Sequence, residues 1–132
     1  MASTVTEVPA ADSASALEHF ADGLRFETDC YDVHRALGAT ADFVLVDVRS
    51  PESFGRAHVP GATNIPHAKI IGSRMASYAS DTLFVVYCAG PHCNGAQRAA
   101  IRLARLKLPV KIMVGGMTGW RDEGFAVASS TS

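Results

Sequence analysis

Three short apolar runs constrain the fold of this chain more than any other feature of its sequence. They cover Phe43–Val48, Leu83–Tyr87 and Val110–Val114, are five or six residues long and are rich in β-branched residues. Runs that are too short for a helix and lack regular polar alternation are typical of strands buried on both faces. The sequence therefore predicts an α/β fold, in which a parallel sheet has helices on both sides.

Helical patterns fill the intervals between these strands. The most regular one runs from Asn94 to Leu108 and stops before Pro109, with an apolar face formed by Ala96, Ala99, Ala100, Leu103 and Leu106. Another begins near Ser13, with Ser13 or Ser15 as its cap, and repeats apolar residues at Leu17, Phe20, Ala21 and Leu24. Shorter elements are predicted as strands at Phe26–Thr28 and Ala62–Ile65, and as helices from Asp29 to Gly38, after Ser50, at Ser73–Ala79 and after Gly115-Gly116.

Composition and charge exclude several classes of protein. The chain has 132 residues, 48% of them apolar, and its 12 Lys and Arg against 13 Asp and Glu give a net charge of −1. Such a chain has no global field that attracts nucleic acid or anionic lipid. The longest apolar run, Leu83–Ala89, is far shorter than the roughly 20 residues of a membrane span. Three cysteines, an odd number, fit reduced thiols better than a disulfide framework, so we expect a cytoplasmic protein.

One domain is expected, spanning residues 13–127. Residues 1–12 and 128–132 are small, polar and aperiodic, which predicts a disordered tail at each end. No cofactor is expected, and no metal either. Cys30 lies far in sequence from Cys88 and Cys93, so the cysteines do not form the paired ligand set of a structural zinc site.

The segment that carries chemistry follows the second apolar run. Cys88 comes directly after that run, and the loop continues through Ala89, Gly90, Pro91, His92, Cys93, Asn94 and Gly95 into a helix. In open α/β sheets, ligands bind beyond the carboxyl ends of the strands. A loop that contains Gly can turn successive amides inward, and the helix N-terminus adds partial positive charge, so both would stabilise Cys88 as a thiolate. The alternative is that Cys88 is only a small buried hydrophobe.

Three segments, taken in order, resemble the rhodanese family. Val44–Pro66 is similar to the amino-terminal signature of that family, with Asp47-Val48-Arg49 after the strand and His58-Val59-Pro60-Gly61-Ala62 further on. Val85–Cys88 and its loop resemble the family's active-site loop, and Val114–Trp120 resembles its closing Gly-Gly-x-x-x-Trp segment. The resemblance extends from about Ser13 to Ala126. It implies a five-stranded parallel sheet flanked by helices on both faces.

The resemblance also implies sulfur transfer through a persulfide on the first residue of the loop, Cys88. Its thiolate would take the outer sulfur of a small donor such as thiosulfate and pass it to cyanide, a low-molecular-weight thiol or a thioredoxin-like protein. The loop amides would stabilise the charge that develops. The alternative is a non-catalytic rhodanese-like module that binds a protein partner, or that senses redox state with the Cys88/Cys93 pair.

The loop departs from the commoner family pattern. Cys88–Asn94 contains no Arg or Lys to match an anionic donor, and His92 is its one candidate cation. Cys93 could resolve the persulfide as a disulfide, protect Cys88 from over-oxidation, or simply pack beneath the loop. Asn94 stands where cysteine phosphatases and arsenate reductases carry the Arg of a Cys-x5-Arg loop, which argues against phosphate chemistry.

Asp47 and Arg49 are the supporting residues of the predicted site. Asp47 is either a catalytic acid or an acceptor for nearby amides, and Arg49 either clamps an anion or pairs with Glu52 or another carboxylate. His58 is predicted to stabilise the turn that follows it, and Trp120 to anchor the core.

Overall fold

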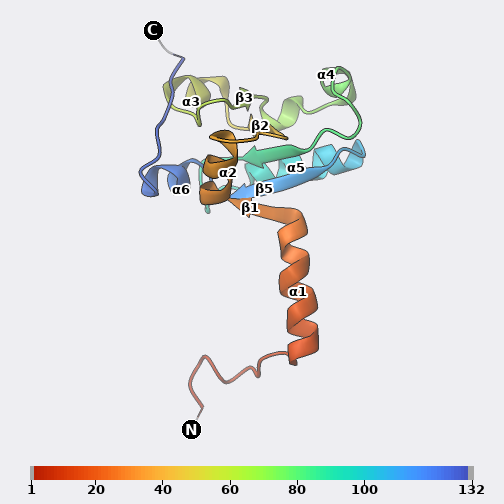
Figure 1. Cartoon of the computed structure of the whole chain (residues 1–132), viewed down its shortest axis with the longest axis vertical. Coiled ribbons are helices and arrows are strands. Elements are labelled where there is room, and N and C mark those ends of the chain that lie inside the picture. Colours follow the sequence, from red (N-terminus) through yellow and green to blue (C-terminus); the bar gives the residue numbers. More distant parts are fainter. Residues whose placement is uncertain (1, 131–132) are drawn as a thin grey trace.

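Five parallel strands form one sheet in the order β1-β5-β4-β2-β3, in a computed structural model that describes residues 2–130 (Figure 1). The strands are β1 (Glu27–Asp29), β2 (Val44–Asp47), β3 (Thr63–Asn64), β4 (Phe84–Tyr87) and β5 (Val110–Val114). The three apolar runs supply the three central strands, which are the ones covered on both faces. The five-stranded parallel sheet expected from the sequence is confirmed.

Helices connect the strands throughout the described part of the chain. They are α1 (Ser13–Phe26), α2 (Cys30–Leu37), α3 (Pro51–Arg56), α4 (Gly72–Met75), α5 (Gly95–Arg105) and α6 (Gly116–Asp122), together with a 3-10 helix at His67–Lys69. Core residues of α2 and α6 pack on one face of the sheet, and those of α4 and α5 on the other (Figure 1). Within residues 2–130, no helix combines the length and apolar character needed to cross a membrane.

The side chains of β4 alternate between two hydrophobic clusters, one on each face of the sheet. Phe84, Val86 and the following Cys88 belong to the cluster beneath α5, whereas Val85 and Tyr87 belong to the cluster beneath α2 and α6. This alternation follows from the two-residue period of a strand. Cys88 and Tyr87 are adjacent in the sequence and therefore lie on opposite faces of the sheet.

Local signals set the boundaries of α2 and α3 as predicted. Asp29 caps α2 by accepting a hydrogen bond from the Asp32 amide at 2.8 Å, and Gly38 follows its last turn. Ser50 caps α3 in the same way, and Pro51 is its first helical residue.

The cap of α1 differs from the prediction. Asp12, rather than Ser13 or Ser15, holds the extended backbone of a cap, and its carboxylate accepts the Ser15 amide at 3.2 Å. A carboxylate also complements the partial positive charge of the helix N-terminus, which a neutral hydroxyl does not.

α5 ends at Arg105, three residues before the predicted Leu108. Lys107 adopts a left-handed backbone with a φ of 63°, and its amide donates to the Ala104 carbonyl at 2.9 Å. The Leu108 amide donates to the Leu103 carbonyl at 3.0 Å. These two bonds form a Schellman motif, with Lys107 in the position that Gly usually occupies. The apolar pattern continues to Leu108 because this leucine still packs against the core beyond the helix.

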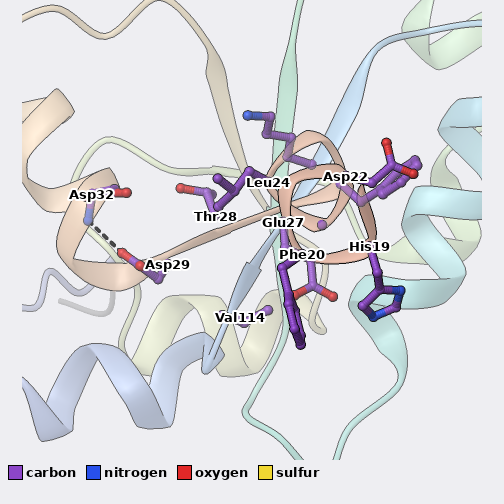
Figure 2. Close-up of a pocket in the computed structure, with 12 residues that line it drawn as sticks. His19, Phe20, Asp22, Leu24, Glu27, Thr28, Asp29, Asp32 and Val114 are labelled. Carbon is purple, nitrogen blue, oxygen red and sulfur yellow. Dashed lines mark hydrogen bonds between the residues drawn. The ribbon is translucent and has the colours of Figure 1, made fainter. Parts of the chain in front are cut away.

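α1 projects away from the sheet instead of covering it (Figure 1). The predicted apolar stripe of this helix is exposed, with Leu17 at 72%, Phe20 at 72% and Leu24 at 73%. The sequence pattern located the stripe correctly, but the helix contributes no buried residue to the core. A hollow of about 750 Å³ lies between α1 and the strands β1 and β5, and Figure 2 shows Phe20, Leu24 and Val114 around it.

The backbone near the carboxyl-terminal end of the described residues is hydrogen-bonded to the domain. Ala128 and His58 exchange backbone hydrogen bonds of 2.9 Å, and the Ser130 amide donates to the Gly55 carbonyl at 2.9 Å. The backbone is thus tied to the domain beyond the boundary predicted at residue 127. Residues 131–132 of the predicted tail lie outside the described residues, as does Met1.

Candidate active site

Cys88 occupies the end of the central strand β4, at the edge of the sheet where the carboxyl ends of the strands meet. It directly follows Tyr87, the last residue of the strand, and is 6% exposed. The strand alternation turns its side chain toward the α5 face. This puts the sulfur between the sheet and the beginning of α5.

Gly95, the first residue of α5, lies against the sulfur of Cys88. A Cβ atom added to Gly95 would be 2.7 Å from Cys88 Sγ and 3.4 Å from Cys93 Sγ, so the bare backbone lets the helix start this close to the sulfur of Cys88 without displacing it. The helix has no side-chain cap at Asn94, and its first turn contains no acidic residue. A negatively charged sulfur at this point interacts favourably with the partial positive charge of the helix N-terminus.

The loop turns its first two carbonyls away from the cysteine and onto α6. The Cys88 carbonyl accepts the Met117 amide at 3.0 Å, and the Ala89 carbonyl accepts both the amide and the hydroxyl of Thr118, at 2.8 and 3.0 Å. Within residues 2–130, several amides of the loop and first helical turn donate no hydrogen bond, namely those of Ala89, Gly90, His92, Asn94, Ala96 and Gln97. Such free donors are the groups that a bound anion requires.

Gly116 is what allows α6 to approach the loop so closely. Its φ is +58°, and an added Cβ would lie 2.5 Å from the Cys88 carbonyl oxygen and 3.0 Å from the Gly90 nitrogen. Only Gly meets both the backbone and the steric requirement. The preceding Gly115 also has a positive φ, of 91°. The pair fixes the position of α6, and α6 in turn fixes the start of the loop.

A cavity of about 410 Å³ opens beside the two loop cysteines. Its lining combines the loop, the first turn of α5 and the end of β5, namely Cys88, Gly90, Pro91, Cys93, Asn94, Ala96, Gln97 and residues 112–116. None of the described residues in this lining is charged, and His92 is not among them. An anionic ligand would therefore be held by amide groups and by the Asn94 and Gln97 side chains. Sequence reasoning missed Gln97, Thr118 and the residues of β5, because only the folded chain brings these segments to Cys88.

Cys93 is joined to Cys88 by a disulfide. The Cys93 amide donates to the Gly90 carbonyl at 3.1 Å, which closes a turn and brings the second cysteine back toward the first. The Cα atoms of the two cysteines are 6.5 Å apart, within the normal range for such a bond. Cys93 is exposed whereas Cys88 is buried. The sequence left open whether Cys93 simply packs beneath the loop, and its exposure and its bond to Cys88 disagree with that alternative.

Asp47, which is buried, and Arg49, which is partly buried, form an ion pair on the other face of the sheet. Arg49 donates to both carboxylate oxygens of Asp47, at 3.0 and 2.7 Å, and the Arg49 amide donates to the same carboxylate at 2.9 Å. Arg49 therefore pairs with Asp47 and not with Glu52. Burial alone would lower the pKa of Arg49, but the hydrogen bond and charge of Asp47 outweigh it and raise that pKa.

Neither member of this pair lies among the described residues that line the cavity beside Cys88. Asp47 aligns with Tyr87 in the β2–β4 register, and both follow the alternation that points away from α5. Burial, followed by the charge of Asp47, raises the pKa of Tyr87, whose hydroxyl accepts the Val59 amide at 3.0 Å. These contacts support the sheet beneath the loop, and the roles of catalytic acid and anion clamp receive no geometric support.

The residues for which the sequence predicts structural roles, His58 in a turn and Trp120 in the core, make the following contacts. His58 is stacked on Phe54, with its Nδ1 atom 2.7 Å from the Phe54 carbonyl oxygen. Trp120 is 2% exposed, and its indole N–H donates to the Ala126 carbonyl at 2.8 Å.

Cys30 lies beneath the Gly115-Gly116 turn and differs chemically from the loop cysteines. Its thiol donates to the carbonyls of Val114 and Gly116, each at 3.6 Å. Burial, with the nearby carboxylates of Asp29 and Glu123, raises the pKa of Cys30 to about 11, so it remains a neutral thiol at neutral pH. Among residues 2–130, no three His, Cys, Asp or Glu side chains gather as a metal site.

Comparison with known proteins shows that this chain is similar to a sulfurtransferase and to part of a transcriptional regulator. A sulfurtransferase of Allochromatium vinosum is 26% identical over 103 residues, which cover 78% of this chain and 94% of that protein. An HTH-type transcriptional regulator of Mycobacterium tuberculosis is 40% identical over 87 residues, or 65% of this chain, and the match spans 38% of the regulator.

The solved structures agree with the fold. The BH2092 protein of Bacillus halodurans is 32% identical, with a TM-score of 0.86 over 90% of this chain and 88% of that one. A thiosulfate sulfurtransferase of Pseudomonas aeruginosa is 21% identical, with a TM-score of 0.68 over 85% of this chain and 22% of that one, and supports the fold alone. The sequence profile of the rhodanese-like domain matches residues 30–123. The chain therefore belongs to the rhodanese-like domain family.

Proposed function

We propose that this protein is a sulfurtransferase in which Cys88 carries the transferred sulfur as a persulfide. The observation that carries the proposal is the contact between the Cys88 sulfur and the first residue of α5, beside the cavity. The two cysteines are joined in the structure, so loading requires the reduced protein.

Sulfur uptake begins with the Cys88 thiolate. It attacks the outer sulfur of thiosulfate, the sulfur–sulfur bond of the donor breaks, and its electron pair leaves with sulfite. The outer sulfur stays on Cys88 as a persulfide anion, and an acceptor thiolate or cyanide then removes it in a second displacement. The free amides of the loop and of α5 would stabilise the negative charge on the outer sulfur.

The uncharged lining of the cavity bears on the choice of donor. A donor with two negative charges would meet only amide donors and the polar ends of Asn94 and Gln97. A persulfide of a low-molecular-weight thiol places less charge at the cysteine itself, and we propose it as the preferred donor class. Phosphate chemistry is disfavoured, because Arg98 donates its Nε hydrogen to Asn94 at 3.2 Å and does not line the cavity.

The first half-reaction tests this function independently of the acceptor. Reduced protein is mixed with one equivalent of thiosulfate, mercaptopyruvate or glutathione persulfide, and sulfite, pyruvate or glutathione is measured. The proposal expects about one equivalent of product from at least one donor, and none above background from Cys88→Ser. Cys30→Ser is the matched control and should behave as the unmodified chain does. Equal product from Cys88→Ser, or none from any donor, would overturn the proposal.

A further inference from the structure

We infer that Cys93 discharges the Cys88 persulfide within the same loop, so that the protein reduces sulfane sulfur to sulfide. The inference rests on the proposed persulfide at Cys88 and adds a second reaction to it. The bond between the two sulfurs in the structure is the product that this second reaction would leave.

The reaction balances without an outside reagent. The Cys93 thiol loses its proton and its sulfur attacks Cys88 Sγ, the inner sulfur of the persulfide. The bond between Cys88 Sγ and the outer sulfur breaks, and hydrosulfide leaves with the electron pair and the proton. The outer sulfur is reduced to sulfide while the two cysteines are oxidised to a disulfide.

Two hydrogen bonds of the loop favour Cys93 as the attacking group. The Gly95 amide donates a hydrogen bond to Cys93 Sγ at 3.4 Å, and this favours the thiolate form of the attacking sulfur. The turn closed by Gly90 and Cys93 holds the second sulfur near the first. Gly95 has no Cβ atom and so leaves room for both sulfurs. An added Cβ would lie 2.7 Å from Cys88 Sγ and 3.4 Å from Cys93 Sγ.

The difference in exposure of the two cysteines suits regeneration of the dithiol. Cys93 is exposed and Cys88 is buried, so an external thiol would reach the Cys93 sulfur first and release Cys88 as the leaving thiolate. A dithiol reductant, of the class to which small redox proteins belong, would complete the reduction. The freed Cys88 is the residue that takes up the next sulfur.

The test follows sulfide, thiols and bound sulfur after a single loading. Reduced protein is loaded with one equivalent of the donor that works best, and no thiol is added beyond the single equivalent that a persulfide donor itself releases. The unmodified chain should release about one sulfide and acquire a Cys88–Cys93 disulfide. Cys93→Ser should retain the sulfur on Cys88 until cyanide removes it as thiocyanate, and its sulfide release should fall at least about tenfold. The serine keeps an acceptor for the Gly95 amide, and Cys30→Ser serves as the matched control.

The outcomes separate this inference from the proposed function. A stable persulfide on the unmodified chain, with no sulfide released, would overturn the inference and leave sulfur transfer intact. Equal sulfide release from Cys93→Ser would overturn it as well. No persulfide on either chain and no sulfide would contradict the proposed function itself.

A separate observation concerns α1, for which we propose a second copy of this chain as the partner. The stripe of Leu17, Phe20 and Leu24 is exposed, and the hollow beside it is lined in part by Phe26 and Val114. Figure 2 shows Phe20, Leu24 and Val114 at this hollow. In a two-fold pair with antiparallel α1 helices, the amino-terminal half of each helix lies beside the hollow of the other. Each stripe then covers its own equivalent, as a symmetric interface requires.

The apolar area involved matches the needs of a small dimer. Covering the three stripe residues and Phe26 removes on the order of 500 Å² from each chain, and roughly 1,000 Å² in total, the lower limit for a specific interface. The hollow, of about 750 Å³, gives the partner helix a concave surface to enter. The pairing should therefore be reversible and dependent on concentration.

Sedimentation velocity of the full chain over a wide range of concentration tests the pairing. The unmodified chain should shift from monomer to dimer, and Leu17→Glu and Leu24→Glu should remain monomeric with an unchanged circular dichroism spectrum. Ser15→Glu adds the same charge on the opposite side of the helix and should still dimerise. A monomeric unmodified chain at every concentration, or dimerisation of Leu24→Glu equal to that of the unmodified chain, would overturn this proposal.

Discussion

The sulfur of Cys88 and the backbone of Gly95 are in direct contact, and a single methyl group at Gly95 would lie 2.7 Å from that sulfur. This contact joins the nucleophile to the first residue of α5. It also explains why the order of strand, loop and helix matters more to the site than any individual polar side chain.

Gly95→Ala should impair sulfur uptake much more than stability. At the first position of a helix, alanine gains at most about 1 kcal/mol over glycine, which offsets part of the overpacking cost of about 1–3 kcal/mol. Displacement of the Cys88 sulfur should slow the transfer of sulfur from the donor to Cys88 by about 100-fold. Stopped-flow measurement of the first half-reaction gives the loss of rate, and urea unfolding gives the loss of stability. A stable variant with an unchanged rate would show that the contact has no role in catalysis.

Gly116→Ala should destabilise the domain by about 3 kcal/mol, since it combines a left-handed backbone with a clash against the Cys88 carbonyl. Gly124 provides a matched control, because its φ is +76° but an added Cβ would meet nothing within 4 Å. Gly124→Ala should therefore cost only about 1 kcal/mol. Equal losses in urea unfolding would contradict the close approach of α6 to the loop.

Arg49→Leu should lower stability without changing donor affinity. It leaves the buried Asp47 carboxylate unpaired, which costs about 3–5 kcal/mol, and the double variant Asp47→Asn with Arg49→Leu should recover part of that loss. Because Asp47 and Arg49 act on the face opposite Cys88, KM for thiosulfate should change by less than about threefold in the folded protein. A large rise in KM without loss of stability would show instead that Arg49 binds the anionic donor, the other role that the sequence left open.

Stability should fall at alkaline pH through Cys30. Burial raises the pKa of its thiol from 9.0 to about 11, so the folded state favours the protonated form. This contribution is complete below about pH 9 and is lost as the pH rises through about 11, with a total on the order of 2 kcal/mol. Urea unfolding near the two limits should show a smaller pH dependence in Cys30→Ser than in the unmodified chain. Tyr87 titrates in both proteins and cancels in the comparison. If the unmodified chain and Cys30→Ser lose stability equally between these pH values, the loss does not come from the Cys30 thiol.

Much of the scaffold could be predicted from the sequence because it depends on local signals. The apolar runs identified the central strands, and Ser50-Pro51 and Asp29 fixed two helix starts. Loop composition and the following helix also pointed to Cys88. The early end of α5 could not be predicted from the sequence. Lys107 ends the helix in a left-handed conformation, and the residue at such a position is usually Gly.

The remaining differences come from contacts between distant segments. Helical periodicity predicts that α1 has an apolar face, but it contains no information on whether the same domain covers that face. Asp47 ends β2 and Cys88 directly follows β4, yet the β2–β4 register aligns Asp47 with Tyr87 and so with the other face. The approach of α6 to the loop depends on how β5 leads into Gly115-Gly116, which only the folded chain determines.

The most direct measurement is peptide-level mass spectrometry of the Cys93→Ser chain after one loading with a sulfur donor. One added sulfur is expected, located on the peptide that contains Cys88 and removed by cyanide. Added sulfur on the Cys30 peptide, or none on the Cys88 peptide with any donor class, would contradict it.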